Sequence, residues 1–176
     1  MGHVLDIGAN LYQQLERHLR HGRQEQVAFA FAEASLANDG VTFRARDLYL
    51  VEPSELSVQE AYHVSLTDEV QAAVIKLAWE KRLALVEFHS HTSTRLPAEF
   101  SYSDLAGLAE FVPHVRWRLQ RQPYLAVVMT PSGLDALVWR GDTPEPLEAL
   151  HVEDRTLTPS GLTIQRIHRE DRAAYG

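Results

Sequence analysis

The amino-acid sequence predicts one compact domain in which a mixed β-sheet is flanked by helices, an α/β (α+β) fold. Three observations support this prediction. The chain has 176 residues and is 45% hydrophobic, which is enough to bury a core in a single domain. Charged residues of both signs make up 23% of the chain and are spread along it, unlike in a disordered protein. The predicted elements follow the order helix, strand, strand, helix, strand, helix, strand, strand, which is typical of a mixed sheet covered by helices.

The first elements are predicted from the spacing of apolar residues. Leucines recur at every fourth position within residues 11–21 and predict a helix. Large and small apolar side chains alternate over residues 26–35 and predict a strand. The Asn-Asp-Gly turn at 38–40 leads into a second strand over residues 41–52, which we expect to bend near Asp47.

The middle of the chain contains two predicted helices and one predicted strand. Residues 53–65 are expected to form a loop with a short strand, and Thr67 is expected to start a helix. The apolar run at 83–89 predicts a central strand that is covered on both sides. A further helix is expected over residues 104–111, ending before Pro113.

A hairpin is predicted next. Two apolar runs at 124–130 and 134–140 flank a Pro-Ser-Gly turn. From Gly141 onward the sequence is polar and rich in turn residues, and one weak strand is expected near residues 162–167.

Composition excludes several classes of function. A net charge of −7 and a pI near 5.7 do not favour a nucleic-acid-binding surface, which would be basic. There is no polybasic segment for an anionic membrane, no apolar run long enough to span a bilayer, and no signal-peptide pattern, so we expect a cytoplasmic protein. The chain has no cysteine and nine histidines, so any metal must be held by His, Asp or Glu. Four histidines have no partner at ligand spacing and are expected on the surface or in the core: His63, His114, His151 and His168.

A pair of histidines at the end of the central strand suggests a metal site. Residues i and i+2 of a strand point to the same side, so His89 and His91 can share a metal ion. Asp104, in the first turn of the next predicted helix, could supply the third ligand. Two imidazoles and one carboxylate leave a fourth tetrahedral position for water, which is the arrangement of catalytic zinc sites. A general base is still needed, and the candidates are Glu25 and Glu33.

The His-Ser-His sequence followed by Ser-x-x-Asp resembles the signature of the JAMM (MPN-plus) metalloproteases, the JAB-domain hydrolases. Residues 25–32 are similar in position and apolar pattern to the glutamate and first strand of that family, with alanines where glycines are usual. The resemblance covers about residues 10–140. It implies a cytidine-deaminase-like JAB/MPN fold, with the catalytic domain in residues 1–145 and a C-terminal extension in residues 146–176 that packs on the same domain or extends it.

The resemblance also implies roles for individual residues. His89, His91 and Asp104 would ligate Zn²⁺. Glu25 would act as the general base that holds the attacking water and then passes its proton to the leaving amine. Ser101 would donate a hydrogen bond to the oxyanion.

The sequence departs from the family pattern around the second histidine. Thr92 stands where proline is usual, and nine residues (92–100) separate His91 from the serine, where the family has seven. This longer segment must bulge outward if Asp104 is to reach the metal. Two alternatives remain open: Glu33 as the base, and Ser101 as a helix N-cap only.

The function implied by the resemblance is that of a zinc metalloprotease of the JAMM isopeptidase, omega-peptidase type. It would cleave the peptide or isopeptide bond at the C-terminus of a ubiquitin-like protein, in deubiquitinase-like processing or deconjugation. The chain is most similar to prokaryotic JAB proteins, some of which accompany ubiquitin-like proteins and their activating and conjugating enzymes in operons. The alternatives are a non-catalytic MPN scaffold that binds partner proteins, and a JAB peptidase that trims a sulfur-carrier protein.

Overall fold

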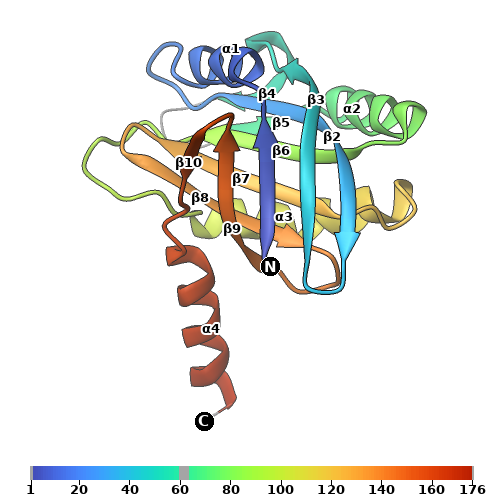
Figure 1. Cartoon of the computed structure of the whole chain (residues 1–176). Helices are drawn as coiled ribbons and strands as arrows, with labels where there is room; N and C mark the ends of the chain where they lie inside the picture. Colours follow the sequence, from blue (N-terminus) through green and yellow to red (C-terminus); the bar gives the residue numbers. More distant parts are fainter. Residues whose placement is uncertain (1, 60–63, 176) are drawn as a thin grey trace.

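The structure, a computed structural model, describes residues 2–59 and 64–175 (Figure 1). Ten strands, four α-helices and one 3₁₀-helix occur within this part of the chain. In chain order they are β1 (His3–Ile7), α1 (Ala9–Leu19), β2 (Val27–Ala37), β3 (Gly40–Leu50), η1 (Pro53–Glu55), β4 (Leu56–Gln59), β5 (Val64–Leu66), α2 (Asp68–Lys81), β6 (Ala84–Ser90), α3 (Tyr102–Arg118), β7 (Tyr124–Thr130), β8 (Gly133–Trp139), β9 (Glu145–Val152), β10 (Arg155–Leu157) and α4 (Leu162–Tyr175).

The main sheet closes on itself. In the described residues its eight strands follow the order β1-β3-β2-β6-β7-β8-β9-β10, and β1 also pairs with β9, so seven of them form a ring and β10 lies outside it. Strand β1 runs parallel to both β3 and β9, and β6 runs parallel to β7. The buried His3 side chain supports the closure, because its Nδ1 accepts a hydrogen bond from the backbone N–H of Val41 in β3 and its Nε2 lies 3.1 Å from Glu145 in β9.

The prediction of a cytidine-deaminase-like JAB/MPN fold, with a mixed sheet flanked by helices, is therefore wrong. The chain forms a closed mixed β-barrel with helices around it, a barrel-like α+β fold. The two strands that close the ring, β1 and β9, were not expected from the sequence. Strand β1 has only five residues, and β9 begins with a Glu-Pro pair in a polar, turn-rich segment, so neither has a strong strand pattern.

One helix prediction and one strand prediction also need correction. Helix α3 continues through Pro113 to Arg118, because Val112 and Val115 on either side of the proline are buried and their packing holds the helix together. The segment after Gly161 is helix α4, not a weak strand. Ile164 and Ile167 are three residues apart and pack on the outer core from one side of this helix.

Other predictions are confirmed. Helices α1 and α2, strands β2 and β3, the central position of β6 and the β7–β8 hairpin all occur close to their expected positions. The expected bend near Asp47 is a β-bulge, since Phe31 pairs with Asp47 whereas the next residue, Ala32, pairs with Ala45. No helix in residues 2–59 and 64–175 has both the length and the apolar character required to cross a bilayer.

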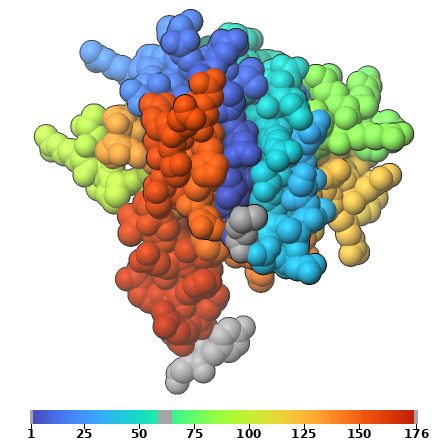
Figure 2. Space-filling model, viewed as in Figure 1, coloured from blue at the N-terminus to red at the C-terminus, as the bar shows by residue number. Residues whose placement is uncertain are grey.

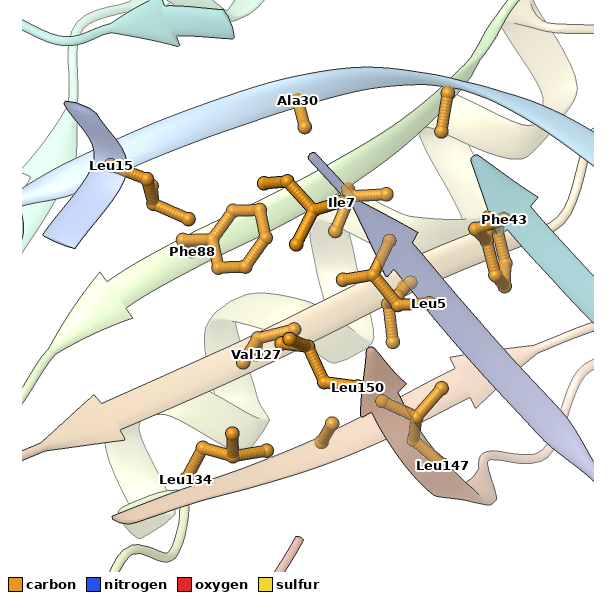
Figure 3. Packing of buried hydrophobic residues seen from close by; sticks show 14 of the residues in the cluster. Leu5, Ile7, Leu15, Ala30, Phe43, Phe88, Val127, Leu134, Leu147 and Leu150 are labelled. Carbon is orange, nitrogen blue, oxygen red and sulfur yellow. The ribbon is translucent and has the colours of Figure 1, made fainter. Parts of the chain in front are cut away.

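The barrel separates two apolar cores. Its interior is filled by side chains from the ring of strands, and α1 covers one end of it with Leu15 and Leu19 (Figure 1). Figure 3 shows residues of this inner core, including Leu5, Ile7, Phe43, Phe88, Val127 and Leu150, pointing toward one another from different strands. The outer core lies between the barrel wall and helices α2 and α3, and Ile164 from α4 joins it.

Helix α4 extends away from the body of the molecule, as the space-filling view shows (Figure 2). Its first two turns pack against the rest of the chain, where Thr163 and Ile164 are buried, and Glu170 further along accepts a hydrogen bond from the hydroxyl of Tyr102 in α3 at 2.8 Å. From His168 to Ala174 its side chains are exposed. The start of α4 is therefore part of the fold, and its end projects from the body of the molecule.

We expect the closing strand β1 to contribute strongly to stability. The substitution Leu5→Ala removes a fully buried side chain from the inner core and should lower the free energy of unfolding by about 2–5 kcal/mol. Leu36→Ala, at an exposed position of β2, is the matched control and should change it by no more than about 0.5 kcal/mol. Urea denaturation followed by circular dichroism measures both. Equal small losses would contradict a stabilising role for the ring closure.

Candidate metal centre

The candidate site lies where β2 begins and β6 ends. These two strands are antiparallel neighbours, and Val27 pairs with His89. One step further, the backbone N–H of Ser90 donates to the Gln26 carbonyl at 3.0 Å, and the Gln26 N–H donates to Ser90 Oγ at 2.9 Å. On the other side of β6, the N–H of His91 donates to the Met129 carbonyl of β7 at 2.8 Å. The backbone that bears both histidines is therefore held from both sides.

Helix α3 brings the carboxylate to the same place. Ser101 is its N-cap, and the side chains and backbones of Ser101 and Asp104 form a reciprocal capping box. The N–H of Ser101 donates to Asp104 Oδ2 at 2.7 Å, and the N–H of Asp104 donates to Ser101 Oγ at 3.1 Å. The positive end of the helix dipole also favours a carboxylate in this first turn.

The predicted ligands come together in the structure. His91 Nε2 lies 3.1 Å from Asp104 Oδ2, and His89 Nε2 lies 3.3 Å from the same oxygen. One ligand atom from each of the three residues lies within 4.8 Å of the others. The His89–His91–Asp104 group could therefore bind a metal ion.

The buried ring of His89 has an unsatisfied nitrogen. Its Nε2 is close enough to Asp104 for an ion pair, but it makes no well-aligned hydrogen bond with any described residue. Burying a polar atom without a hydrogen bond is unfavourable, so such an atom calls for an explanation. A metal ion coordinated at this nitrogen would supply one.

The ionisable groups of the site change one another's pKa values. Burial by itself lowers the pKa of His89, but contact with Asp104 and the charges of two further carboxylates outweigh burial and raise the pKa above its usual value. Burial by itself raises the pKa of Asp104, but its contacts with the two histidines and with the Ser101 N–H hold that pKa well below its usual range. Asp104 is thus an anion that attracts cations, including protons on the imidazoles.

The long segment between His91 and Ser101 projects outward in its middle and returns to the core. Arg95 and Leu96 are exposed, whereas Phe100 is fully buried. This path lets Asp104 reach the histidines in spite of the added length.

The two candidate bases lie in different surroundings. Glu25 is buried, and its Oε1 lies 3.9 Å from His91 Nε2. Glu33 lies further along β2, where its half-exposed side chain pairs with Arg46 at 2.6 Å. Ser101 is the N-cap of α3, and its hydroxyl oxygen accepts a hydrogen bond from the helix backbone. Its hydroxyl hydrogen therefore remains able to donate. The Oγ of Ser103 lies 3.0 Å from that of Ser101.

A cleft of about 390 Å³ adjoins the ligands. Its walls come from β5, α2 and α3, and Glu87 and His89 line it from β6. The sequence reasoning missed Glu87, although it lies two residues before His89 and so shares its side of the strand. Burial raises the pKa of Glu87, and the hydroxyl of Tyr124 donates a hydrogen bond to it.

The other histidines have varied surroundings. His114, which was expected on the surface or in the core, is exposed and lines this same cleft. His151 contacts Asp6, and His168 is exposed on α4. His63 lies outside the described residues. A second hollow, of about 210 Å³, lies on the other side of the site, where His91 and Thr92 meet Leu19 of α1 and Met129 of β7.

Comparisons with known proteins do not identify a family. No protein-family model matches the chain, and no curated protein matches it. Among solved structures, the solution structure of protein DSY2949 from Desulfitobacterium hafniense is similar with a TM-score of 0.49 and 18% sequence identity, over 85% of this chain and 94% of that one. Similarity at that level supports no conclusion about the function of this chain.

The raised pKa of His89 predicts how metal binding depends on pH. An imidazole must lose its proton to coordinate a metal. Since the pKa of His89 lies above the usual value of about 6.5, protons should compete with the metal at a higher pH than for an ordinary histidine. Asp104 stays ionised throughout, because its pKa is lowered.

We therefore expect the affinity for Co²⁺ to fall as the pH is lowered from about 8 to about 6, by up to about tenfold per pH unit for each proton displaced. Titrations at several pH values measure it. His151→Ala, which changes a histidine outside the site, should leave the profile unchanged, and a pH-independent affinity in the unchanged chain would contradict the prediction.

Proposed function

We propose that the chain is a zinc-dependent hydrolase that cleaves the peptide or isopeptide bond at the C-terminus of a ubiquitin-like protein. The observation that carries the proposal is the convergence of His89, His91 and Asp104 beside the buried carboxylate of Glu25. The fold expected with the JAMM resemblance is wrong, so the proposal rests on the local geometry of these residues. The ubiquitin-like substrate and the accompanying activating and conjugating enzymes come from the resemblance of the motif alone, and the cytoplasmic setting comes from the sequence composition and the lack of a signal-peptide pattern.

The donor set favours zinc among the common metals. Two imidazoles and one carboxylate are ligands found in catalytic zinc sites, whereas Ca²⁺ and Mg²⁺ prefer oxygen ligands throughout. Ligand atoms about 2.0–2.2 Å from a tetrahedral ion lie roughly 3.3–3.6 Å from each other. The two His–Asp distances, 3.1 and 3.3 Å, are close to this range. A zinc ion held by these residues would polarise a substrate carbonyl and lower the pKa of water.

The chain supplies the groups that move protons. Glu25 lies beside the ligands, and as a general base it would take a proton from the attacking water and then deliver it to the leaving amine. The hydroxyl of Ser101 would donate a hydrogen bond to the oxygen of the former carbonyl as negative charge develops there. Its capping bonds to Asp104 hold it in place for this role.

The hollows on either side of the ligands suit an extended substrate chain. A tail that crosses from the larger cleft to the smaller hollow would bring one carbonyl to the ligand group. Ser65 and Leu66 of β5 line the larger cleft, and in the described residues β5 pairs only with β4. A tail in the larger cleft would therefore lie beside β5.

The proposed base can be tested by an isosteric substitution. Glu25→Gln should keep zinc bound and lower the rate of cleavage of a ubiquitin-like fusion protein by about 10²–10⁴-fold, because the amide cannot accept the proton. Glu33→Gln is the matched control on the same strand and should cleave at the normal rate. If Glu33→Gln lost activity and Glu25→Gln kept it, the assignment of the base would be reversed.

The metal itself can be tested by elemental analysis. We expect about one zinc ion per chain in the unchanged protein and a loss of zinc in His89→Ala, which removes one of the three ligands. The control His168→Ala, at an exposed position of α4, should keep its zinc. No bound zinc, even after zinc is added, would rule out the hydrolase and favour the non-catalytic scaffold.

A further inference from the structure

Phe100 contacts the metal centre in two ways. Its ring packs edge-to-face against the ring of His89, with centroids 5.5 Å apart and an interplanar angle of 62°. It also immediately precedes Ser101, the cap of the helix that carries Asp104. Because Phe100 is fully buried, a shift of this residue would disturb a ligand on each side of the site.

The backbone of Phe100 is held by the start of helix α4. Its N–H donates to Thr163 Oγ1 at 3.0 Å, and its carbonyl accepts a hydrogen bond from the guanidinium of Arg166. Two residues earlier, the carbonyl of Ala98 accepts a hydrogen bond from Ser160 Oγ at 2.6 Å. The returning arm of the long segment 92–100 is thus fastened to a part of the chain about 60 residues away in sequence.

The start of α4 is in turn fixed to the barrel by one carboxylate. Asp135 of β8 is almost fully buried, and its two oxygens accept hydrogen bonds from the N–H groups of Gly161 (3.0 Å) and Thr163 (2.9 Å). The N–H of Ser160 donates to the Leu134 carbonyl at 2.9 Å. A continuous set of contacts therefore connects β8, through the first turn of α4 and Phe100, to the ligand group.

We propose that Thr163 is a positioning residue of the metal centre, acting through Phe100 on His89 and Asp104. The inference rests on the metal site of the proposed function. It gives the C-terminal segment a role that the histidine motif does not reveal. The middle of the segment 92–100 is exposed, so Asp104 gains its fixed position from the anchored end of that segment and from the helix cap.

The test compares Thr163→Val with Thr163→Ser. Valine has nearly the shape of threonine but no hydroxyl, so the buried N–H of Phe100 loses its acceptor, whereas serine keeps it. We expect Thr163→Val to weaken Co²⁺ binding by about 10–100-fold, as is typical when a group that orients a ligand is removed. Its visible absorption spectrum with Co²⁺, which reports coordination geometry, should also change. Thr163→Ser should keep the affinity and the spectrum of the unchanged protein.

A second variant and a control separate positioning from general destabilisation. Arg166→Met removes the hydrogen-bond donor to the Phe100 carbonyl and should also weaken Co²⁺ binding. Because the Arg166 side chain is less buried than Thr163, this variant replaces Thr163→Val if that variant does not fold. Phe43→Leu is the control in the inner core. Phe43 lies on β3 and pairs with Ala34, near the end of β2 that is away from the metal centre. This variant should lower the unfolding temperature without altering the Co²⁺ absorption spectrum.

The outcomes distinguish the inference from the proposed function. Normal affinity and spectrum in Thr163→Val would overturn the positioning role and leave the metal site intact. An equal spectral change in Phe43→Leu would also overturn that role, because it would show that any loss of stability has this effect. If the unchanged protein did not bind Co²⁺ or Zn²⁺ at all, the metal site and the inference would both fail.

Discussion

The parallel pairing of β1 with β9 is the constraint on which the rest of the structure depends. It joins the strand nearest the N-terminus to a strand that begins at Glu145, and so converts an open sheet into a ring. Only a closed ring encloses the inner core, because apolar side chains then face one another from all sides. Closure also leaves the outer face of β2, β6, β7 and β8 for helices α2 and α3, and α3 brings Asp104 to the end of β6.

At that end of the barrel, Asp104 is where the contributions of distant segments meet. One of its oxygens lies within 3.3 Å of both imidazoles and accepts a hydrogen bond from the N–H of Ser101. Several positive or hydrogen-bonding groups thus surround a single carboxylate, which keeps it ionised in a largely buried place. A metal ion coordinated at this centre would also satisfy the buried nitrogen of His89.

The local geometry of the site and the fold around it are separate properties of this chain. The histidines need only the end of a strand, the glutamate needs the start of an antiparallel neighbour, and the aspartate needs the first turn of a helix. A barrel meets these conditions as well as the mixed sheet flanked by helices that the motif resemblance implied. The chemistry open to this chain therefore depends on the positions of His89, His91, Asp104 and Glu25, and little on the fold around them.

Short-range patterns in the sequence determined much of this protein. The alternation at β2, the apolar run of β6 and the helical spacing in α1 and α2 depend on neighbours a few residues apart, and so does the projection of His89 and His91 to one side. Tertiary structure alone decided the ring closure and the anchoring of Phe100 by Thr163. These features join residues far apart in sequence, and β1 and β9 are strands because they hydrogen-bond to each other and to their second neighbours, β3 for β1 and β8 and β10 for β9.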